Sequence, residues 1–328
     1  MSETNNTTDI AIIGAGPAGL SAAIYVQRAG KKSTVFESMT VGGQIVNTPE
    51  IANYPGIKKV SGFEFSMGLY EQATELGAEI IYDEVADVKR VDNSSDMANH
   101  YSYRIRTGSG KVYKAKAVII ATGAKNRHLG IDREEELLGR GVSYCATCDG
   151  AFYKGKDVAV NGGGNTALDD ALFLSNYCNK VYIIHRRDEF RGEPEKLELL
   201  KTKENVEFVL NSTVRELRGE KSLEEIVVSS SVQGNKQDDV QASDQVAGER
   251  IINVQGLFIA IGQVPDNIRF ADLVELDKSG YIIADESCKS KTPGVFVAGD
   301  TRTKNVRQLT TAAADGAVAA LGACEFIK

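Results

Sequence analysis

The amino-acid sequence predicts an α/β fold with two Rossmann-like, three-layer (ββα) nucleotide-binding domains. Three observations lead to this fold class. A strand pattern, a glycine-rich turn and a helix pattern follow one another from Asp9, and the same order returns from Asp157. The chain has 328 residues, about twice the length of a typical domain. Strand patterns resume near the C-terminus, so we expect a discontinuous first domain with the second inserted into it.

The first unit begins with an apolar strand at residues 9–13. A helix is expected over residues 17–29, where Ala, Leu and Val recur at helical spacing, and a second strand over residues 33–36. The glycines of the intervening G-x-G-x-x-G turn let backbone amides approach a pyrophosphate at a helix N-terminus. An acid closes the second strand, where it can bond a ribose hydroxyl. The predicted dinucleotide-binding residues are Gly14, Gly16, Pro17, Ala18, Gly19 and Glu37.

The segments that flank the second unit define the expected domain limits. Residues 103–107 and 117–120 predict meander strands that end at Thr122 and Gly123, and runs at 256–261 and 294–300 precede a final helix over residues 311–326. Residues 92–100 are polar, and residues 229–245 are expected to form an extended hairpin tip. We therefore expect domains at residues 1–124, 125–254 and 255–328, with the first and third forming one body.

The second unit repeats the pattern with a different charge. Strands are expected at residues 157–160 and 181–184 and a helix at 168–177. The glycine-rich turn consists of Gly162, Gly163, Gly164, Asn165, Thr166 and Ala167. Glu37 lies 23 residues after Gly14, and the residue 23 after Gly162 is His185. The acid is therefore replaced by a basic cluster consisting of His185, Arg186, Arg187 and Arg191.

This basic cluster indicates the nucleotide. A carboxylate would repel a 2'-phosphate, whereas guanidinium groups match it in charge and geometry, so the second site should prefer NADPH to NADH. A solvated charged face is the alternative, because Asp188 and Glu189 lie among the arginines. His185 could contact the ligand or simply pack at the strand end. Two sites of different charge suggest FAD in the first unit and NADPH in the second, and Asp300 could bond the ribityl chain of the flavin.

Cys145 and Cys148 form a C-x-x-C motif, whose short loop brings two sulfurs within disulfide range. Half a zinc site is the alternative, but it lacks two clear further ligands in a chain with three His and isolated other cysteines. Asp149 could carry the proton that dithiol chemistry needs, or serve as a turn or N-cap residue. The remaining cysteines, Cys178, Cys288 and Cys324, are expected to be buried small apolar residues.

Composition excludes some partners. A net charge of -7 argues against nucleic acid, because phosphate binding needs a basic surface. No apolar run approaches the roughly 20 residues that span a bilayer, and the polar N-terminus has no signal-peptide pattern. Five cysteines with one close pair fit a reducing compartment. We expect a cytoplasmic protein that binds neither membrane nor nucleic acid.

These motifs together resemble those of low-molecular-weight thioredoxin reductases, NADPH-dependent, FAD-containing pyridine nucleotide-disulfide oxidoreductases. They are residues 14–19 (GAGPAG), 42–44 (GGQ), 145–149 (CATCD), 162–167 (GGGNTA), 185–191 (HRRDEFR), 299–300 (GD) and 307–309 (RQL). They follow the family's order with compatible spacing, over nearly the whole chain. Asn161 replaces the usual aliphatic residue before the glycines, and residues 229–245 form a longer tip than the family's pattern has.

The resemblance implies a fold, an activity and further site residues. It implies a homodimer in which the FAD domain and the inserted NADPH domain rotate between half-reactions, about hinges near residues 124–126 and 254–256. Electrons pass from NADPH through FAD to the dithiol, with Cys148 nearer the flavin and Cys145 attacking the disulfide of thioredoxin. Asp149 is the implied acid. The implied flavin-binding residues include Gly42, Gly43, Gln44, Asn53, Thr122, Gly123, Asp300, Arg307, Gln308 and Leu309.

Two rival functions share parts of this pattern. A flavin dithiol oxidase would use the same cysteines and pass electrons to oxygen, but the basic cluster at 185–191 argues against it. A reductase driven by ferredoxin or flavodoxin would need no nicotinamide site, and the second glycine-rich turn argues against that function.

Overall fold

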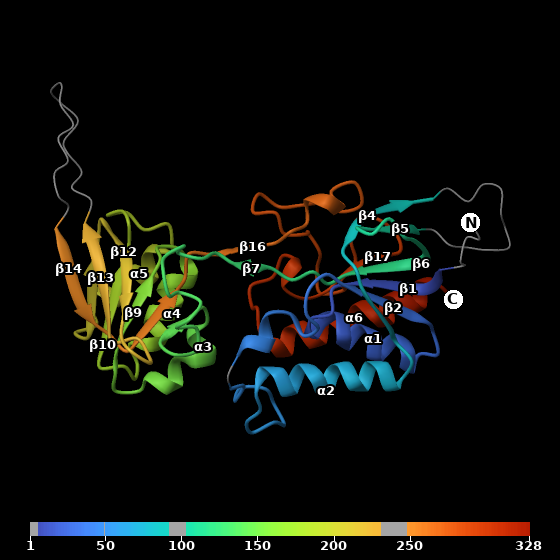
Figure 1. Cartoon of the computed structure of the whole chain (residues 1–328). Coiled ribbons are helices and arrows are strands. Elements are labelled where there is room, and N and C mark those ends of the chain that lie inside the picture. The colour runs from blue at the N-terminus through green and yellow to red at the C-terminus, as the bar shows by residue number, and fades with distance from the viewer. Residues whose placement is uncertain (1–5, 49, 92–102, 231–247) are drawn as a thin grey trace. The chain divides into compact units, whose positions relative to one another are not determined.

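The computed structural model describes residues 6–48, 50–91, 103–230 and 248–328. These residues form two compact units, and each is described by itself (Figure 1). The first unit contains the chain up to Lys125 together with Val264–Lys328, and the second contains Asn126–Gln263. Both units combine parallel strands with helices, so the predicted α/β class is confirmed.

The first unit is built on a sheet with the order β3-β2-β1-β6-β5-β4, in which β17 also pairs with β6. The strands next to β1 run parallel to it, and β4, β5 and β6 form an antiparallel meander. Buried apolar residues lie on both faces of this sheet, as its parallel centre requires. The strands are β1 (Thr7–Ile13), β2 (Ser33–Glu37), β3 (Glu79–Tyr82), β4 (Val85–Arg90), β5 (Tyr103–Thr107), β6 (Val112–Ile120) and β17 (Val295–Val297).

The helices of the first unit are α1 (Pro17–Arg28), α2 (Gly62–Glu75) and α6 (Leu309–Phe326), which lie along one side of the sheet (Figure 1). The two helices α1 and α6 pack closely because Gly316 has no side chain. A Cβ at Gly316 would lie 2.2 Å from the Ala18 carbonyl oxygen. The Ser21 hydroxyl also donates to the Ala313 carbonyl at 2.7 Å. Short 3-10 turns complete the unit: η1 (Gly43–Asn47), η3 (Ile268–Phe270) and η4 (Gly299–Thr301).

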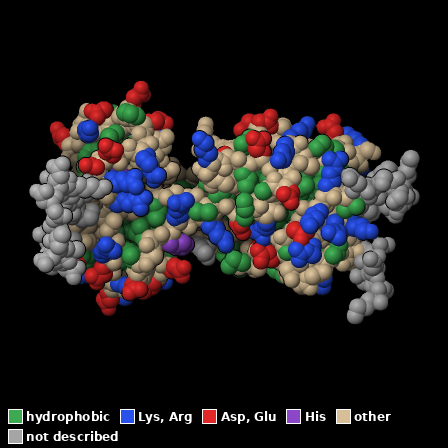
Figure 2. Space-filling view, turned by 90° about the horizontal axis from the view of Figure 1, so that it is seen from above, with side chains coloured by type: hydrophobic (Ala, Val, Ile, Leu, Met, Phe, Trp, Pro, Cys, Tyr) green, Lys and Arg blue, Asp and Glu red, His purple; other side chains and the backbone are tan. Residues whose placement is uncertain are grey.

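The second unit has a five-stranded parallel sheet with the order β11-β10-β9-β15-β8, and a three-stranded antiparallel sheet with the order β12-β13-β14. Its strands are β8 (Val142–Ser143), β9 (Asp157–Asn161), β10 (Lys180–Ile184), β11 (Val206–Val209), β12 (Ser212–Arg218), β13 (Glu225–Ser230), β14 (Glu249–Asn253) and β15 (Gly256–Ile259). Its helical segments are α3 (Ala146–Asp149), η2 (Gly150–Tyr153), α4 (Asn165–Leu174) and α5 (Pro194–Lys201). Acidic and basic side chains are interspersed over the faces shown in Figure 2.

One expected segment lies in the other unit. The run beginning at Gly256 was expected to return to the first domain, but β15 pairs in parallel with β9 and belongs to the second unit. The return connection is therefore at Gln263–Val264 (β16), rather than at residues 254–256. It pairs with the outgoing connection β7 (Lys125–Asn126). An apolar strand pattern specifies burial on both faces and says nothing of which sheet it joins.

Other element limits differ by a few residues. The helix α4 starts at Asn165 and ends at Leu174, earlier than the expected 168–177, because helical geometry begins directly after the extended Gly164. The strand β6 begins at Val112 instead of residue 117. The expected polar stretch at 92–100 and nearly all of the hairpin tip at 229–245 lie outside the described residues. Within the described residues, no helix has the length and apolar character that crossing a membrane requires.

Candidate redox and nucleotide sites

The first glycine-rich turn joins β1 to α1. A Cβ at Gly14 would lie 2.4 Å from the Ala121 carbonyl oxygen, and a Cβ at Gly19 would lie 1.9 Å from the Gly14 carbonyl oxygen. These two glycines are therefore required by packing. Gly16 meets nothing within 4 Å, so the space beside the N-terminus of α1 is open to a ligand. Pro17 and Ala18 form the first turn of this helix.

Glu37 holds the same turn from the end of β2. One carboxylate oxygen accepts from the Ala15 amide and the other from the Met39 amide, both at 2.8 Å. The Gly42 amide donates to the Ala15 carbonyl at 2.8 Å, and both Gly42 and Gly43 have a positive φ. The segment at 42–44 is therefore joined to the glycine-rich turn, as a shared binding site would require.

Four side-chain atoms of the described residues in the first unit are buried without a hydrogen-bond partner, and two of them belong to predicted flavin-binding residues. The Oδ1 atom of Asp300 is one, and the Nε atom of Arg307 is the other. Burial raises the pKa of Asp300, and the cations Lys304 and Arg307 act against it. The Arg307 guanidinium lies 4.2 Å from the centre of the Tyr281 ring. A buried acceptor and a buried donor fit the hydroxyls and charged groups of a dinucleotide, since leaving either unbonded is costly.

The remaining predicted residues of the first site also lie in this unit. Gln44 donates through its side-chain amide to the Ala124 carbonyl, and the Asn53 amide lies 3.4 Å from the Gln308 side-chain oxygen. Gln308 is the N-cap of α6, and Leu309 is its first residue. At the end of β6, the Thr122 hydroxyl lies 3.0 Å from that of Thr301, and Gly123 follows with a positive φ.

The second glycine-rich turn joins β9 to α4. A Cβ at Gly162 would lie 2.4 Å from the Ala260 carbonyl oxygen, and one at Gly163 would lie 2.2 Å from the His185 ring. Gly164 meets nothing within 4 Å, which again leaves an open approach before a helix N-terminus. Asn165 and Thr166 begin α4 as exposed residues, and Ala167 is buried.

His185 occupies the space beneath this turn. Its ring centre lies 4.9 Å from that of Phe190, its Nε2 atom lies 3.1 Å from the Glu189 carbonyl oxygen, and only 7% of the residue is exposed. Burial lowers the pKa of His185, and the nearby arginines act in the same direction. Of the two alternatives left open by the sequence, the packing role is the one that the structure supports.

The three arginines that follow are exposed. Arg186, Arg187 and Arg191 form no ion pair within the described part of the chain. The Arg191 amide donates to the Gly163 carbonyl at 2.8 Å, which brings their loop to the glycine-rich turn. Uncompensated guanidinium groups beside a helix N-terminus fit a phosphate well.

The two motif cysteines form a disulfide at the start of α3. Cys145 and Cys148 are bonded to each other, with 5.3 Å between their Cα atoms, and both are partly exposed. Sulfurs joined in this way are not thiolate ligands, so the disulfide disfavours the zinc alternative. Cys178, Cys288 and Cys324 are free and buried, as predicted. Burial raises their pKa values, to about 11 for Cys178 and about 12 for Cys288.

Asp149 lies at the end of α3 and faces Ser143. The Ser143 hydroxyl donates to Asp149 Oδ2 at 2.6 Å and accepts from the Cys145 amide at 3.0 Å. Burial raises the pKa of Asp149, and the bond from Ser143 acts against this rise. A partly buried carboxyl of raised pKa, bonded through one hydroxyl to the cysteine backbone, is suited to carry a proton. Ser143 is not among the residues predicted from the sequence, which offers only its position two residues before Cys145 as a signal.

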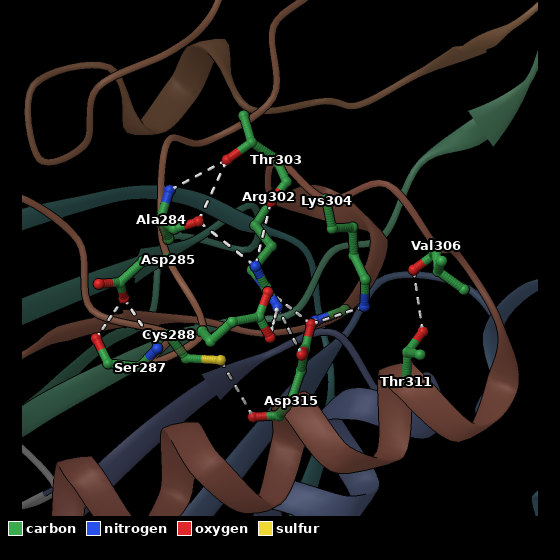
Figure 3. A network of polar contacts seen from close by, with 12 residues as sticks. Ala284, Asp285, Ser287, Cys288, Arg302, Thr303, Lys304, Val306, Thr311 and Asp315 are labelled. Carbon is green, nitrogen blue, oxygen red and sulfur yellow. Dashed lines mark hydrogen bonds and ion pairs between the residues drawn. The ribbon is translucent and has the colours of Figure 1, made fainter. Parts of the chain in front are cut away.

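A polar network beside Asp300 was not predicted from the sequence. Asp315 on α6 bonds Arg302, Lys304 and the Gly299 amide, and Asn267 bonds Thr301 on the other side of the turn (Figure 3 shows the Asp315 part). Arg302 and Lys304 lie in the loop after β17, whereas Asp315 lies on α6, and no local sequence pattern links the two segments. The signal that the sequence offers is one Asp within the Ala-rich helix pattern at residues 311–326.

Comparison with known proteins places these sites in context. The model of the family described as pyridine nucleotide-disulphide oxidoreductase matches residues 8–316. The chain is 40% identical to a thioredoxin reductase of Listeria innocua, over all of this chain and 96% of the relative, and 38% identical to a thioredoxin reductase of Bacillus subtilis, over 98% and 95%. A crystal structure of thioredoxin reductase from Streptococcus pyogenes superposes with a TM-score of 0.87 at 35% identity, covering 98% of this chain and 99% of that one.

Proposed function

Because the chain belongs to the pyridine nucleotide-disulphide oxidoreductase family, we propose that it is a thioredoxin-disulfide reductase that uses NADPH and FAD. The family uses a flavin and a nicotinamide cofactor. In the net reaction NADPH and one proton reduce the disulfide of thioredoxin, or of a thioredoxin-like protein, to a dithiol and leave NADP⁺. The Cys145–Cys148 disulfide is the observation that carries this proposal, because it lies beside a proton-carrying carboxyl in the unit of the basic nucleotide site.

The first unit is proposed to hold FAD. Its open approach at Gly16, the carboxylate of Glu37 and the unpartnered groups of Asp300 and Arg307 fit a pyrophosphate, a ribose and a ribityl chain. The residues at 42–44, Asn53, Thr122, Gly123, Gln308 and Leu309 complete the proposed pocket. When bound, the flavin accepts two electrons from a nicotinamide and delivers them to a disulfide.

The second unit is proposed to hold NADPH. The pyrophosphate would lie at Gly164 and the N-terminus of α4, and Arg186, Arg187 and Arg191 would bind the 2'-phosphate. His185 supports Gly163 from below and keeps the arginine loop in place. These assignments explain why three exposed arginines cluster without acidic partners among the described residues.

The cysteine pair is proposed to be the exit for electrons. Two electrons and two protons open the Cys145–Cys148 bond and give two thiols. The Cys145 thiolate then attacks the thioredoxin disulfide to form a mixed disulfide, and Cys148 displaces the reduced thioredoxin and restores the original bond. Asp149 carries the proton, with Ser143 fixing its carboxyl. Rotation of one unit against the other between half-reactions is part of this proposal, as are a homodimeric state, a cytoplasmic location, a role in cell redox homeostasis and the absence of nucleic-acid or membrane partners.

Anaerobic titration tests the proposal. NADPH should bleach the flavin of the purified protein, NADH should do so far less well, and thioredoxin should restore the colour as it is reduced. In Cys148→Ser the flavin should still bleach, but thioredoxin reduction should fall by at least about 10³-fold, because no disulfide can form. Cys178→Ser is the matched control and should behave as the wild type, since that cysteine is buried and free. Thioredoxin turnover by Cys148→Ser would contradict the route, and rapid oxygen consumption with a small dithiol would favour an oxidase.

A further inference from the structure

Asp315 is a buried carboxylate on α6 that the proposed chemistry does not use. Its Oδ2 atom accepts from the Gly299 amide at 3.0 Å, from Arg302 Nε at 2.9 Å and from Lys304 Nζ at 2.9 Å. Its Oδ1 atom accepts from Arg302 Nη2, also at 2.9 Å (Figure 3). Four donors from one loop therefore converge on a single side chain.

The negative charge of Asp315 is balanced against two buried cations, so a neutral side chain could not substitute for it. The side chains of Arg302, Lys304 and Asp315 are only 2%, 5% and 8% exposed. The other carboxylate on Arg302 is that of Glu286, which is 93% exposed and 3.2 Å away. Burial acts to raise the pKa of Asp315, but the bonds from Arg302 and Lys304 outweigh it and lower the pKa. Without this carboxylate, Lys304 would lose its ion pair and Arg302 would keep only the exposed carboxylate of Glu286.

The helix that carries Asp315 is fixed to the first glycine-rich turn. Gly316 lets α6 approach the Ala18 carbonyl, and the Ser21 hydroxyl bonds the Ala313 carbonyl. Asp315 therefore projects from a rigid position beside the start of α1. The loop that it holds is the less regular partner, since η4 is a single 3-10 turn.

The bonds of Asp315 flank Asp300. Gly299 precedes Asp300, has φ of +80° and donates its amide to Asp315, and Arg302 follows two residues later. Thr301 is held from the other side by the Asn267 side chain, at 2.6 Å. The Asp300 carboxyl itself keeps a buried oxygen without a partner among the described residues. The network thus fixes the backbone on both sides of a carboxyl that it leaves available.

We infer that Asp315 is a positioning residue for flavin binding: through the Gly299 amide and Arg302, it holds the Asp300 carboxyl where it accepts hydrogen bonds from the ribityl hydroxyls of FAD. This inference rests on the proposed function, because it assumes FAD in the first unit. It predicts a selective effect. Loss of Asp315 should weaken binding of the ribityl part of FAD, which Asp300 would contact. Binding of the adenine, ribose and pyrophosphate should stay unchanged, because the first glycine-rich turn and Glu37 would hold them.

The test measures two ligands on the apoprotein, by flavin fluorescence. Direct titration gives the Kd of FAD, and ADP added as a competitor of bound FAD gives the affinity of the adenine half at the same site. In Asp315→Asn we expect FAD to bind about tenfold more weakly, about 1.4 kcal/mol, with the ADP constant changed less than about twofold. Glu286→Gln is the matched control on the same arginine and should change neither value, because that carboxylate is exposed.

A double-mutant cycle separates positioning from general weakening. Asp300→Ala should lose about as much FAD affinity as Asp315→Asn, and the double variant should lose no more than Asp300→Ala alone, since Asp315 acts only through Asp300. Additive losses would overturn the inference, and so would an equal loss of ADP affinity, which indicates a general structural role.

Misfolding of the variant and failure of the proposed function can each be distinguished from failure of the positioning role. If Asp315→Asn does not fold, Asp315→Asn with Lys304→Met removes one buried cation together with the carboxylate, and the same measurements apply. If the wild-type apoprotein does not bind FAD, the proposed function fails; if it binds FAD and Asp315→Asn binds equally well, the positioning role alone is wrong.

Discussion

The two glycine-rich turns share a sequence pattern but are built from different polar groups. The first turn requires Gly19, because a Cβ there would lie 1.9 Å from the Gly14 carbonyl oxygen. The second has Ala167 at the equivalent position, and its Cβ fills the space above Gly162. The acid that fixes the first turn, Glu37, is replaced in the second by the packed ring of His185, whose pKa is lowered by burial.

Under the proposed assignment of FAD to the first unit and NADPH to the second, this difference would let one motif serve two ligands. In the first unit the Glu37 carboxylate bonds the Ala15 amide of the turn, and the unpartnered atoms of Asp300 and Arg307 are buried. The second presents exposed arginines to solvent. Buried groups select by geometry and are poorly screened by salt, whereas exposed cations attract a phosphate through a field that salt weakens. The following predictions test this contrast, from the largest expected effect to the smallest.

Replacing each of these two turn residues by its counterpart should destabilise the two units by unequal amounts. Gly19→Ala should destabilise the first unit by more than about 3 kcal/mol, because its Cβ meets backbone that cannot move aside. Ala167→Gly should cost the second unit only about 1 kcal/mol, mainly in helix propensity. Denaturant unfolding of each variant measures both values. Equal costs for the two exchanges would show that the turns pack alike.

The arginines should affect one ligand and depend on salt. Replacing both Arg186 and Arg187 with Ala should raise the KM for NADPH by about 10- to 100-fold, from the loss of charge-assisted bonds of about 1.5–3 kcal/mol, and leave the KM for NADH unchanged. The wild-type preference should shrink as ionic strength rises. Arg215→Ala is the control, as an exposed arginine elsewhere in the same unit. A similar loss with NADH would indicate that the cluster does not contact the 2'-phosphate.

Substitution of Asn161 probes how the end of β9, just before the second glycine-rich turn, contributes to stability. It is 9% exposed, and its side chain forms no hydrogen bond with the described residues, whereas the first unit has Ile13 at the equivalent place. Asn161→Val should stabilise the second unit by about 1 kcal/mol, because a β-branched apolar side chain suits a strand end that is 9% exposed. Thermal unfolding measures the gain, and Ile13→Asn should do the reverse in the first unit. A loss of stability would mean that Asn161 has a structural partner.

His185 should make the second unit sensitive to acid. Its pKa is lowered by burial, so the unfolded chain takes up a proton at higher pH than the folded chain does. Stability should therefore be complete above the unfolded value of 6.5 and fall as pH drops below it. Unfolding midpoints between pH 7 and pH 5 should show this decline, and His185→Phe should remove that part of it. An unchanged decline in the variant would place the sensitivity elsewhere.

Local patterns were enough to predict much of the fold and of the site. Strand and helix periodicity predicted both repeats, because burial of one face constrains spacing along a single segment. Local spacing also predicted the glycine-rich turns, Glu37, the arginine cluster and the C-x-x-C pair as site residues, since each brings its chemistry together within a few residues. The disulfide at Cys145 and Cys148 needs only a short loop.

The tertiary structure decided which segments meet. It placed β15 in the second sheet, turned His185 into a packing residue beneath Gly163, and brought Ser143 to Asp149. It also set Asp315 against the loop that carries Asp300. Such contacts join segments that are far apart in the sequence. They therefore produce no periodic pattern of residues along the chain from which they could be predicted. The sequence by itself therefore determined the two binding motifs and the redox pair, whereas only the packed structure determined which buried groups hold them in position.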